Sequence, residues 1–325
     1  MLKQLLLSAA GGFKTMIGGQ ALIEGILMMG PEKKSVVVRK PDGQLAVKTE
    51  PRKSIKSKHP WLGLPFIRGV AGFGSSMYNG VKALMYSAEF YPEDEEDEPS
   101  KFEKWMDAKF GSEKLSSALI TLSMVLGMAF SIFLFFLLPT AISGLAIHFI
   151  PGFPLWGRNL VEGGLRMVIF LGYLILCSKM KDIHRTFQYH GAEHKTIFCY
   201  EAGLELTVEN VRKQPKHHPR CGTSFLFVVI FISILLSSIV FAFVHMENTF
   251  ARMGVHLLLL PLVVAITYEI NHYVGGHDGL ICRIIRAPGM GIQRWTTFEP
   301  DASMMEVGIR ALQEVLPEEQ GADRW

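Results

Sequence analysis

Residues 115–138 read LSSALITLSMVLGMAFSIFLFFLL and contain no charged side chain. A helix needs about 20 predominantly apolar residues to cross a lipid bilayer, and this stretch exceeds that length. Buried helices of soluble proteins are seldom apolar on every side over such a distance. The stretch therefore predicts a membrane-spanning helix and, with it, an integral membrane protein.

Three further stretches repeat the pattern, at residues 165–178, 223–245 and 253–273. The first of them reaches the length of a span only when residues 161–164 are added. The last carries one acidic residue, Glu269, near its end. We therefore predict an α-helical polytopic membrane protein with four transmembrane helices.

The composition excludes several other classes of protein. Of the 325 residues, 49% are hydrophobic and 19% are charged, and the mean hydropathy is +0.25. These values exclude a disordered chain and a coiled coil. The four cysteines have no paired spacing, so they are expected as thiols or metal ligands, not as a disulfide framework. A net charge of +3 does not require a nucleic-acid partner, and none is expected.

Lysine and arginine residues are distributed unevenly between the loops. Residues 151–164 contain only Arg158, and residues 246–252 contain only Arg252. The loop at residues 179–222 contains eight lysines and arginines. Because loops rich in these residues stay in the cytoplasm, this loop and both termini are predicted to be cytoplasmic. The protein is expected in the cell membrane, with the lipid bilayer as its first partner.

The remaining sequence predicts three regions. Residues 1–114 form an N-terminal cytoplasmic domain, residues 115–273 the four-helix membrane domain with its cytoplasmic His-rich loop at 179–222, and residues 274–325 a C-terminal cytoplasmic segment. The N-terminal domain is expected to be small and of mixed α/β structure.

Local patterns predict individual elements within these regions. Residues 35–49 predict a β-hairpin with its turn at Asp42-Gly43, and residues 21–29 predict one buried strand that contains Glu24. Residues 70–90 predict an interfacial or packed helix. Residues 301–316 predict an amphipathic helix, because apolar residues recur there at helical spacing.

The polar motif with the clearest chemistry follows the second span and reads YHGAEHK, residues 189–195. His190 and His194 are four residues apart, so on a helix they share a face and can bind one metal ion. Glu193 completes the H-x-x-E-H spacing of inverted zinc peptidases, in which the glutamate is the general base. A pair of surface histidines is the alternative.

Further polar residues could complete a metal site. Glu269 is the leading candidate for a third ligand, because a carboxylate in an apolar helix is costly unless it pairs or binds a cation. His272, one turn on, is an alternative ligand, and the alternative to a metal-binding Glu269 is an ion pair with an arginine such as Arg220. The segment HPRCG, residues 218–222, offers His218 as a reserve ligand and Cys221 as another donor. On spacing alone, the same segment is equally well explained as a capped helix start.

Several blocks of the sequence resemble the YqhQ-like family of bacterial membrane proteins, which are usually labelled predicted metal-dependent enzymes. These blocks are GGQALIEGILMMGP (18–31), YHGAEHKTI (189–197), HPRCGTSFL (218–226), Tyr268-Glu269 and TTFEPD (296–301). The resemblance extends from about Gly18 to Leu316. It implies that the family's polar positions are Glu24, His190, Glu193, His194, His218, Arg220, Cys221 and Glu269.

These observations favour two kinds of function. The first is a membrane-embedded metal-dependent hydrolase at the cytoplasmic face, with zinc bound by His190, His194 and Glu269 and with Glu193 as the proton acceptor. The second is a metal-stabilised scaffold that binds other membrane proteins, in which four protein ligands saturate the ion. Metal transport is a weaker third reading, because the first three spans have no carboxylate at mid-membrane depth.

Overall fold

The computed structural model describes residues 13–52, 60–91, 122–123, 125–150, 154–244, 246, 248–319 and 321–324. The chain divides into two compact units. Unit 1 comprises residues 1–91, 173–233 and 260–325, and unit 2 comprises residues 92–172 and 234–259. The N-terminal and C-terminal segments, which the sequence suggests are separate regions, thus belong to one unit.

Unit 1 contains an antiparallel sheet of four strands in the order β1-β2-β3-β4. The strands are β1 (Gly18–Leu22), β2 (Gly25–Met29), β3 (Lys33–Arg39) and β4 (Leu45–Pro51). β3 and β4 confirm the predicted hairpin, and Gly43 in its turn has a φ of 83°. Glycine adopts this angle without steric cost because it has no Cβ.

The prediction of a single strand over residues 21–29 is wrong. The chain reverses at Ile23-Glu24, and Leu22 pairs with Gly25 as β1 turns into β2. Glu24 has a φ of 48°, which an L-residue rarely adopts. The sequence does not show this reversal, because both strands are rich in buried apolar residues and the tight turn contains no Asn-Gly or Asp-Gly pair.

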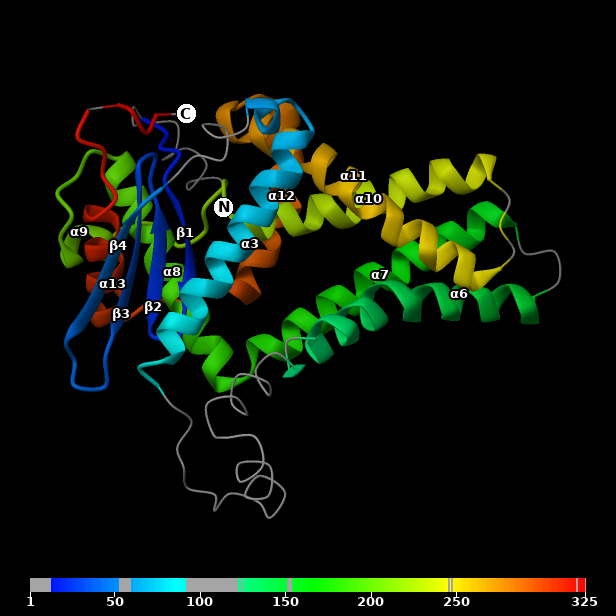
Figure 1. Cartoon of the computed structure of the whole chain (residues 1–325), viewed down its shortest axis with the longest axis horizontal. Helices are drawn as coiled ribbons and strands as arrows, with labels where there is room; N and C mark the ends of the chain where they lie inside the picture. The colour runs from blue at the N-terminus through cyan, green and yellow to red at the C-terminus, as the bar shows by residue number, and fades with distance from the viewer. Residues whose placement is uncertain are drawn as a thin grey trace, which may run out of the picture. The chain divides into compact units, whose positions relative to one another are not determined.

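Helices cover both faces of this sheet (Figure 1). On one face, Ile26, Met28 and Val37 pack with buried residues of α8 (Lys181–Glu201) and α13 (Ala302–Gln313). On the other face, Leu27 and its neighbours pack against α3 (Ile67–Ala88). Since successive side chains of a strand point to opposite faces, β2 is apolar throughout and is buried on both sides.

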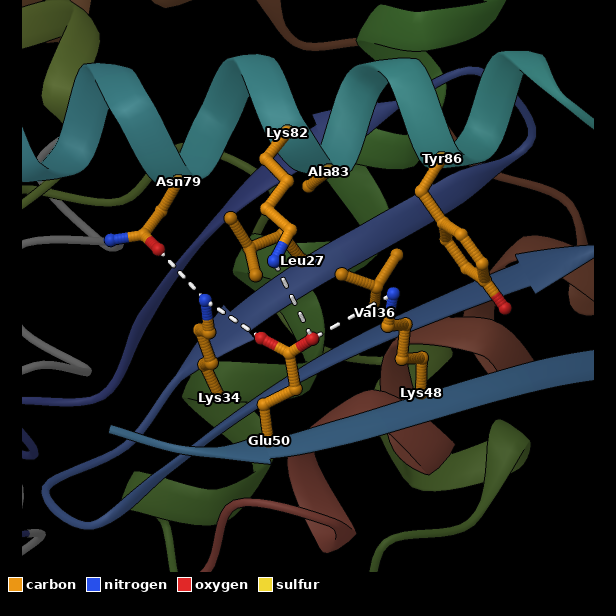
Figure 2. A pocket seen from close by; sticks show the side chains of 9 residues that line it. All are labelled: Leu27, Lys34, Val36, Lys48, Glu50, Asn79, Lys82, Ala83 and Tyr86. Atoms are coloured by element: carbon orange, nitrogen blue, oxygen red, sulfur yellow. Dashed lines mark hydrogen bonds and ion pairs between the residues drawn. The ribbon is translucent and has the colours of Figure 1, made fainter. Parts of the chain in front are cut away.

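The contact between α3 and the sheet is partly polar, as Figure 2 shows from close by. Beside the buried Ala83, the Glu50 carboxylate of β4 meets three ammonium groups. Lys34 lies 3.1 Å from it, and Lys48 and Lys82 each lie 3.7 Å from it. These partners lower the pKa of Glu50, with the Lys34 hydrogen bond as the largest cause.

The described residues include four helical segments that by length and composition could cross a membrane. They are Val125–Leu145, Gly157–Ser178, Phe225–Phe243 and Phe250–Gly276. Residues 115–121 and 124 of the predicted first span lie outside the described part of the chain. The segments belong to the helix that contains η2 (Phe133–Leu137) and α6 (Leu138–Phe149), and to α7 (Leu155–Ser178), α10 (Gly222–Phe243) and α11 (Thr249–Gly276).

Unit 2 has a buried charge cluster around the Glu162 carboxylate of α7. Thr140 of α6 donates a 2.7 Å hydrogen bond to it, and Arg166 donates one of 3.1 Å. From α11, Arg252 lies 3.2 Å from the same carboxylate and His256 also contacts it. The side chains of Glu162, Arg166, Arg252 and His256 are at most 4% exposed. Such a cluster joins the apolar helices α6, α7 and α11 through polar contacts.

The rest of the described chain forms short elements and two further helices. A 3₁₀ turn, η1 (Pro60–Gly63), precedes α3, and α9 (Val208–Arg212) follows α8. The amphipathic C-terminal helix is confirmed as α13, and the Asp301 carboxylate caps it by accepting a 3.0 Å bond from the Met304 amide. Helix α12 (Leu280–Thr296) was not predicted from the sequence, because Pro288, Gly289 and Gly291 have low helix propensity and interrupt its helical pattern.

Candidate metal centre

Helix α8 presents His190 and His194 side by side, with ring centroids 4.3 Å apart. The Nδ1 atom of His190 hydrogen-bonds to the Thr296 carbonyl at 2.7 Å, and that of His194 to the Lys216 carbonyl at 2.6 Å. A carbonyl oxygen only accepts, so each Nδ1 must carry the proton. In the neutral form of each ring the Nε2 atom is therefore left as the ligand atom, an arrangement common among metal-binding histidines.

Cys221 completes a cluster of three donors with these two histidines. Its Sγ lies 3.1 Å from His190 Nε2, and ligand atoms of all three residues lie within 4.8 Å of one another. The Nε2 atom of His194 is buried and has no hydrogen-bond partner among the described residues. A buried polar atom without a partner is costly unless something binds it. Two imidazoles and a thiol suit Zn²⁺, so the donor set fits the expected metal.

The electrostatics of the cluster favour the ligand forms of its side chains. Burial lowers the pKa of His194 to about 4, which keeps the ring neutral. Burial raises the pKa of the Cys221 thiol, but the positive charge that the His194 ring carries when protonated and hydrogen bonds with Thr223 outweigh this effect, and the pKa is lowered overall. A thiolate is the form of cysteine that binds metals.

Glu193 lies between the two histidines in sequence and is buried against β1. Its Oε1 accepts a 3.0 Å hydrogen bond from the Gly19 amide, whereas Oε2 is buried without a hydrogen-bond partner among the described residues. Burial raises the pKa of Glu193 to about 7, and the nearby His190 opposes this effect. The carboxyl group is not among the grouped donors His190, His194 and Cys221.

Glu269, predicted as the third ligand, lies in a different contact. Its carboxylate accepts a 2.8 Å hydrogen bond from Arg68 Nε, a second contact from the same guanidinium, and a 3.1 Å bond from the Phe66 amide. The alternative of an arginine partner is thus what the structure shows, with Arg68 in place of Arg220. This pair joins the start of α3 to α11, and Cys221 takes the position proposed for Glu269.

His218 and Arg220 both pair with Glu201 at the end of α8. Arg220 forms an ion pair with the Glu201 carboxylate, and His218 Nε2 lies 3.6 Å from it. The amide side chain of Gln293 accepts from the His218 backbone N–H and donates to the His218 backbone carbonyl, both at 2.8 Å. These contacts fix the turn that leads to Cys221.

Glu24 supports α8 at a point next to the cluster. Its carboxylate receives two contacts from the Arg185 guanidinium and a 3.0 Å hydrogen bond from the Tyr189 hydroxyl. Burial, with Glu24 next in effect, raises the pKa of Tyr189. Tyr189 immediately precedes His190, so Glu24 helps to set the rotation of α8.

Sequence reasoning missed several of the groups that organise the cluster. The carbonyls of Lys216 and Thr296 leave no signal in a sequence, because every residue has one. Gln293 and Glu201 belong to no recognisable sequence motif. Arg68 could have been found, since a carboxylate at the end of a predicted span calls for a cationic partner.

Comparison with known proteins places the chain in a family. Residues 64–318 match the family described as "Protein of unknown function (DUF1385)". The chain is also 33% identical over 306 residues to the "Uncharacterized protein YqhQ" of Bacillus subtilis (strain 168), with 92% of each chain covered. The chain belongs to this YqhQ-like family. No solved structure matches it. The relationship confirms the resemblance seen in the sequence blocks. All of these blocks except the one at residues 18–31 lie within residues 64–318, the part of the chain that matches the family.

Proposed function

We propose that this protein is a membrane-embedded, metal-dependent hydrolase whose zinc site faces the cytoplasm. The observation that carries the proposal is the convergence of His190 Nε2, His194 Nε2 and Cys221 Sγ, with both Nδ1 atoms engaged by backbone carbonyls. Three protein ligands leave a fourth position for water or substrate, which is the pattern of catalytic zinc sites.

The chain's own residues would divide the chemistry between them. When bound, the ion supplies Lewis-acid activation of water and of the substrate's carbonyl or phosphoryl group. The carbonyls of Thr296 and Lys216 hold the two imidazoles in the ligand tautomer. Glu193 would accept a proton from water at Oε2, the oxygen that no described group occupies, while the Gly19 amide holds Oε1.

Membrane insertion is part of the same proposal. Four apolar helices of sufficient length support it, and the lysine and arginine residues between α7 and α10 support a cytoplasmic position for the cluster and for both termini. A membrane-impermeant maleimide should label an added cysteine at Pro154, an exposed position before the second candidate span, in intact cells and should not label one at Asp42 or Glu318. The parent protein gives the background from its four native cysteines. Labelling at Asp42 would show that the N-terminal part faces the outside and would contradict the proposed orientation.

A metal-stabilised scaffold remains the competing proposal. The observation that favours it is the position of His218, whose ring centroid lies 5.6 Å from that of His194. A modest shift of the His218 ring away from Glu201 would supply a fourth ligand and close the site. The two proposals therefore differ in the fourth ligand, which is an exchangeable water or substrate in the hydrolase and His218 in the scaffold.

Metal analysis and X-ray absorption of the purified protein test both proposals. We expect about one zinc per chain, lost in the His190→Ala/His194→Ala variant and retained in Glu269→Ala, which removes a carboxylate outside the cluster. Absorption should show one sulfur, two imidazoles and one light ligand that exchanges with solvent. Three imidazoles and one sulfur would support the scaffold. Full metal content in the double-histidine variant would overturn both proposals.

The role of Glu193 is tested separately. The Glu193→Gln variant should retain the ion, because the carboxylate is not a ligand, and should lose hydrolysis of any substrate that the wild-type protein cleaves. Loss of the ion from this variant would instead make Glu193 a ligand.

A further inference from the structure

Helix α12 has an apolar face that no described residue covers. Leu280, Ile281 and Ile284 are 75%, 72% and 62% exposed, and Trp295 follows on the same side at 36%. The opposite face is buried within unit 1 and contains Cys282, Arg286, Gly289, Ile292, Gln293 and Thr296. An apolar face on an otherwise folded helix points to a further partner.

The position of α12 in the chain identifies that partner. The candidate span of α11 ends at Gly276, and α12 begins four residues later. Arg286 fixes the turn between them, because its guanidinium hydrogen-bonds to the carbonyls of Val274 and His277 and lies 3.2 Å from the Asp278 carboxylate. The start of α12 is therefore held close to the level at which α11 leaves the bilayer.

Charge on the exposed side agrees with this position. Arg283 and Arg294 are exposed, and on a helical projection both lie on one flank of the apolar face. Helices that lie in the plane of a membrane have this distribution: apolar residues reach the acyl boundary while flanking arginines extend to the headgroups. Tryptophan is also enriched at this depth.

We propose that α12 lies in the cytoplasmic interface of the bilayer, with the face formed by Leu280, Ile281, Ile284 and Trp295 inserted into lipid. The same helix holds the candidate metal centre from its buried face, through the Thr296 carbonyl on His190 and the Gln293 amide on His218. The metal centre then lies directly beneath the membrane surface. The placement of α12 rests on the membrane insertion proposed above, and the position of the metal centre rests in addition on the proposed zinc site.

Photo-crosslinking of the full-length, metal-free protein in nanodiscs tests the placement. A benzophenone amino acid at position 284 should yield protein–lipid adducts detectable by mass spectrometry. The same probe at Glu306, an exposed position on α13 in unit 1, should yield at least tenfold fewer. A probe at Ile239, in the candidate span of α10, serves as the positive control. Nanodiscs with and without phosphatidylglycerol would show the contribution of the two arginines.

The outcomes are distinct. Lipid adducts at position 284 comparable to those at position 239 support the proposal, whatever the metal content of the protein. Crosslinks from position 284 to the protein's own N-terminal residues, or to a second copy of the chain, would overturn it. Because no metal is present, a negative result leaves the hydrolase proposal to its own test, and a failed metal analysis leaves the placement of α12 intact.

Discussion

The Nε2 atom of His190 lies 3.1 Å from the Sγ atom of Cys221, although the two residues are 31 positions apart. The histidine comes from the middle of α8, and the cysteine stands one residue before α10. The segment between them folds back so that Cys221 reaches His190, because Gln293 and Glu201 hold the turn at His218 and Arg220. The pairing converts a histidine pair on one helix into a three-donor site.

Replacement of Cys221 by serine should weaken zinc binding at least about 100-fold, because even groups that only orient a ligand are worth 10- to 100-fold in affinity. Competition with a chromogenic chelator measures the change. Cys282→Ser is the matched control, since Cys282 is buried elsewhere on α12. Equal affinities in both variants would exclude Cys221 as a ligand.

Gln293→Ala should weaken zinc binding about 10- to 100-fold without removing a ligand, because the turn that positions Cys221 loses two hydrogen bonds. The zinc that still binds should keep its sulfur ligand in X-ray absorption. Gln188→Ala, which removes one exposed side-chain bond to the Glu299 carbonyl, provides the comparison and should leave affinity unchanged. A loss of sulfur coordination without a change in affinity would contradict this role.

Glu162→Ala should destabilise unit 2 by about 3–5 kcal/mol, the typical cost of removing one partner from a buried ion pair. Two buried guanidinium groups, of Arg166 and Arg252, lose their carboxylate. Thermal unfolding in detergent should show a clearly lower midpoint. Glu209→Ala removes an exposed glutamate–lysine pair on α9 and should not change the midpoint. An unaltered midpoint for Glu162→Ala would mean that the cluster contributes no net stability.

Asp301→Ala should cost about 1 kcal/mol through loss of the α13 cap, while Asp301→Asn retains the cap and should cost less. Burial opposes ionisation of Asp301, but hydrogen bonds from Ser303 and the Met304 amide prevail, so its pKa is lowered from 3.8. The charged form therefore stabilises the fold above pH 3.8, and this contribution is lost as the pH falls below that value.

Unfolding of the Asp301 variants in detergent checks the sign of this effect. The difference between wild type and Asp301→Asn, measured at pH 7, should shrink as the pH is lowered toward 3. A difference that grew on acidification would show that the carboxyl group is stabilising in its protonated form.

The sequence by itself determined the elements whose signal is local. Apolar runs gave the number of candidate spans, Asp42-Gly43 gave the β3–β4 turn, and the spacing of Met304, Met305 and Leu312 gave α13. The i, i+4 spacing of His190 and His194 likewise placed two imidazoles on one face of α8. In each case, the local structure depends on residues that are close together in the sequence.

Tertiary structure alone decided which distant groups meet. In the sequence Glu269 was the leading third ligand and His218 the reserve, with Cys221 as a further donor. In the structure Arg68 pairs with Glu269, and the turn before α10 brings Cys221 to His190. Packing also brings the carbonyls of Thr296 and Lys216 to the two histidine rings, and it places the buried face of α12 beside the cluster. A contact between residues far apart in the chain depends on how whole helices pack, and that packing is a collective free-energy minimum that no single motif encodes.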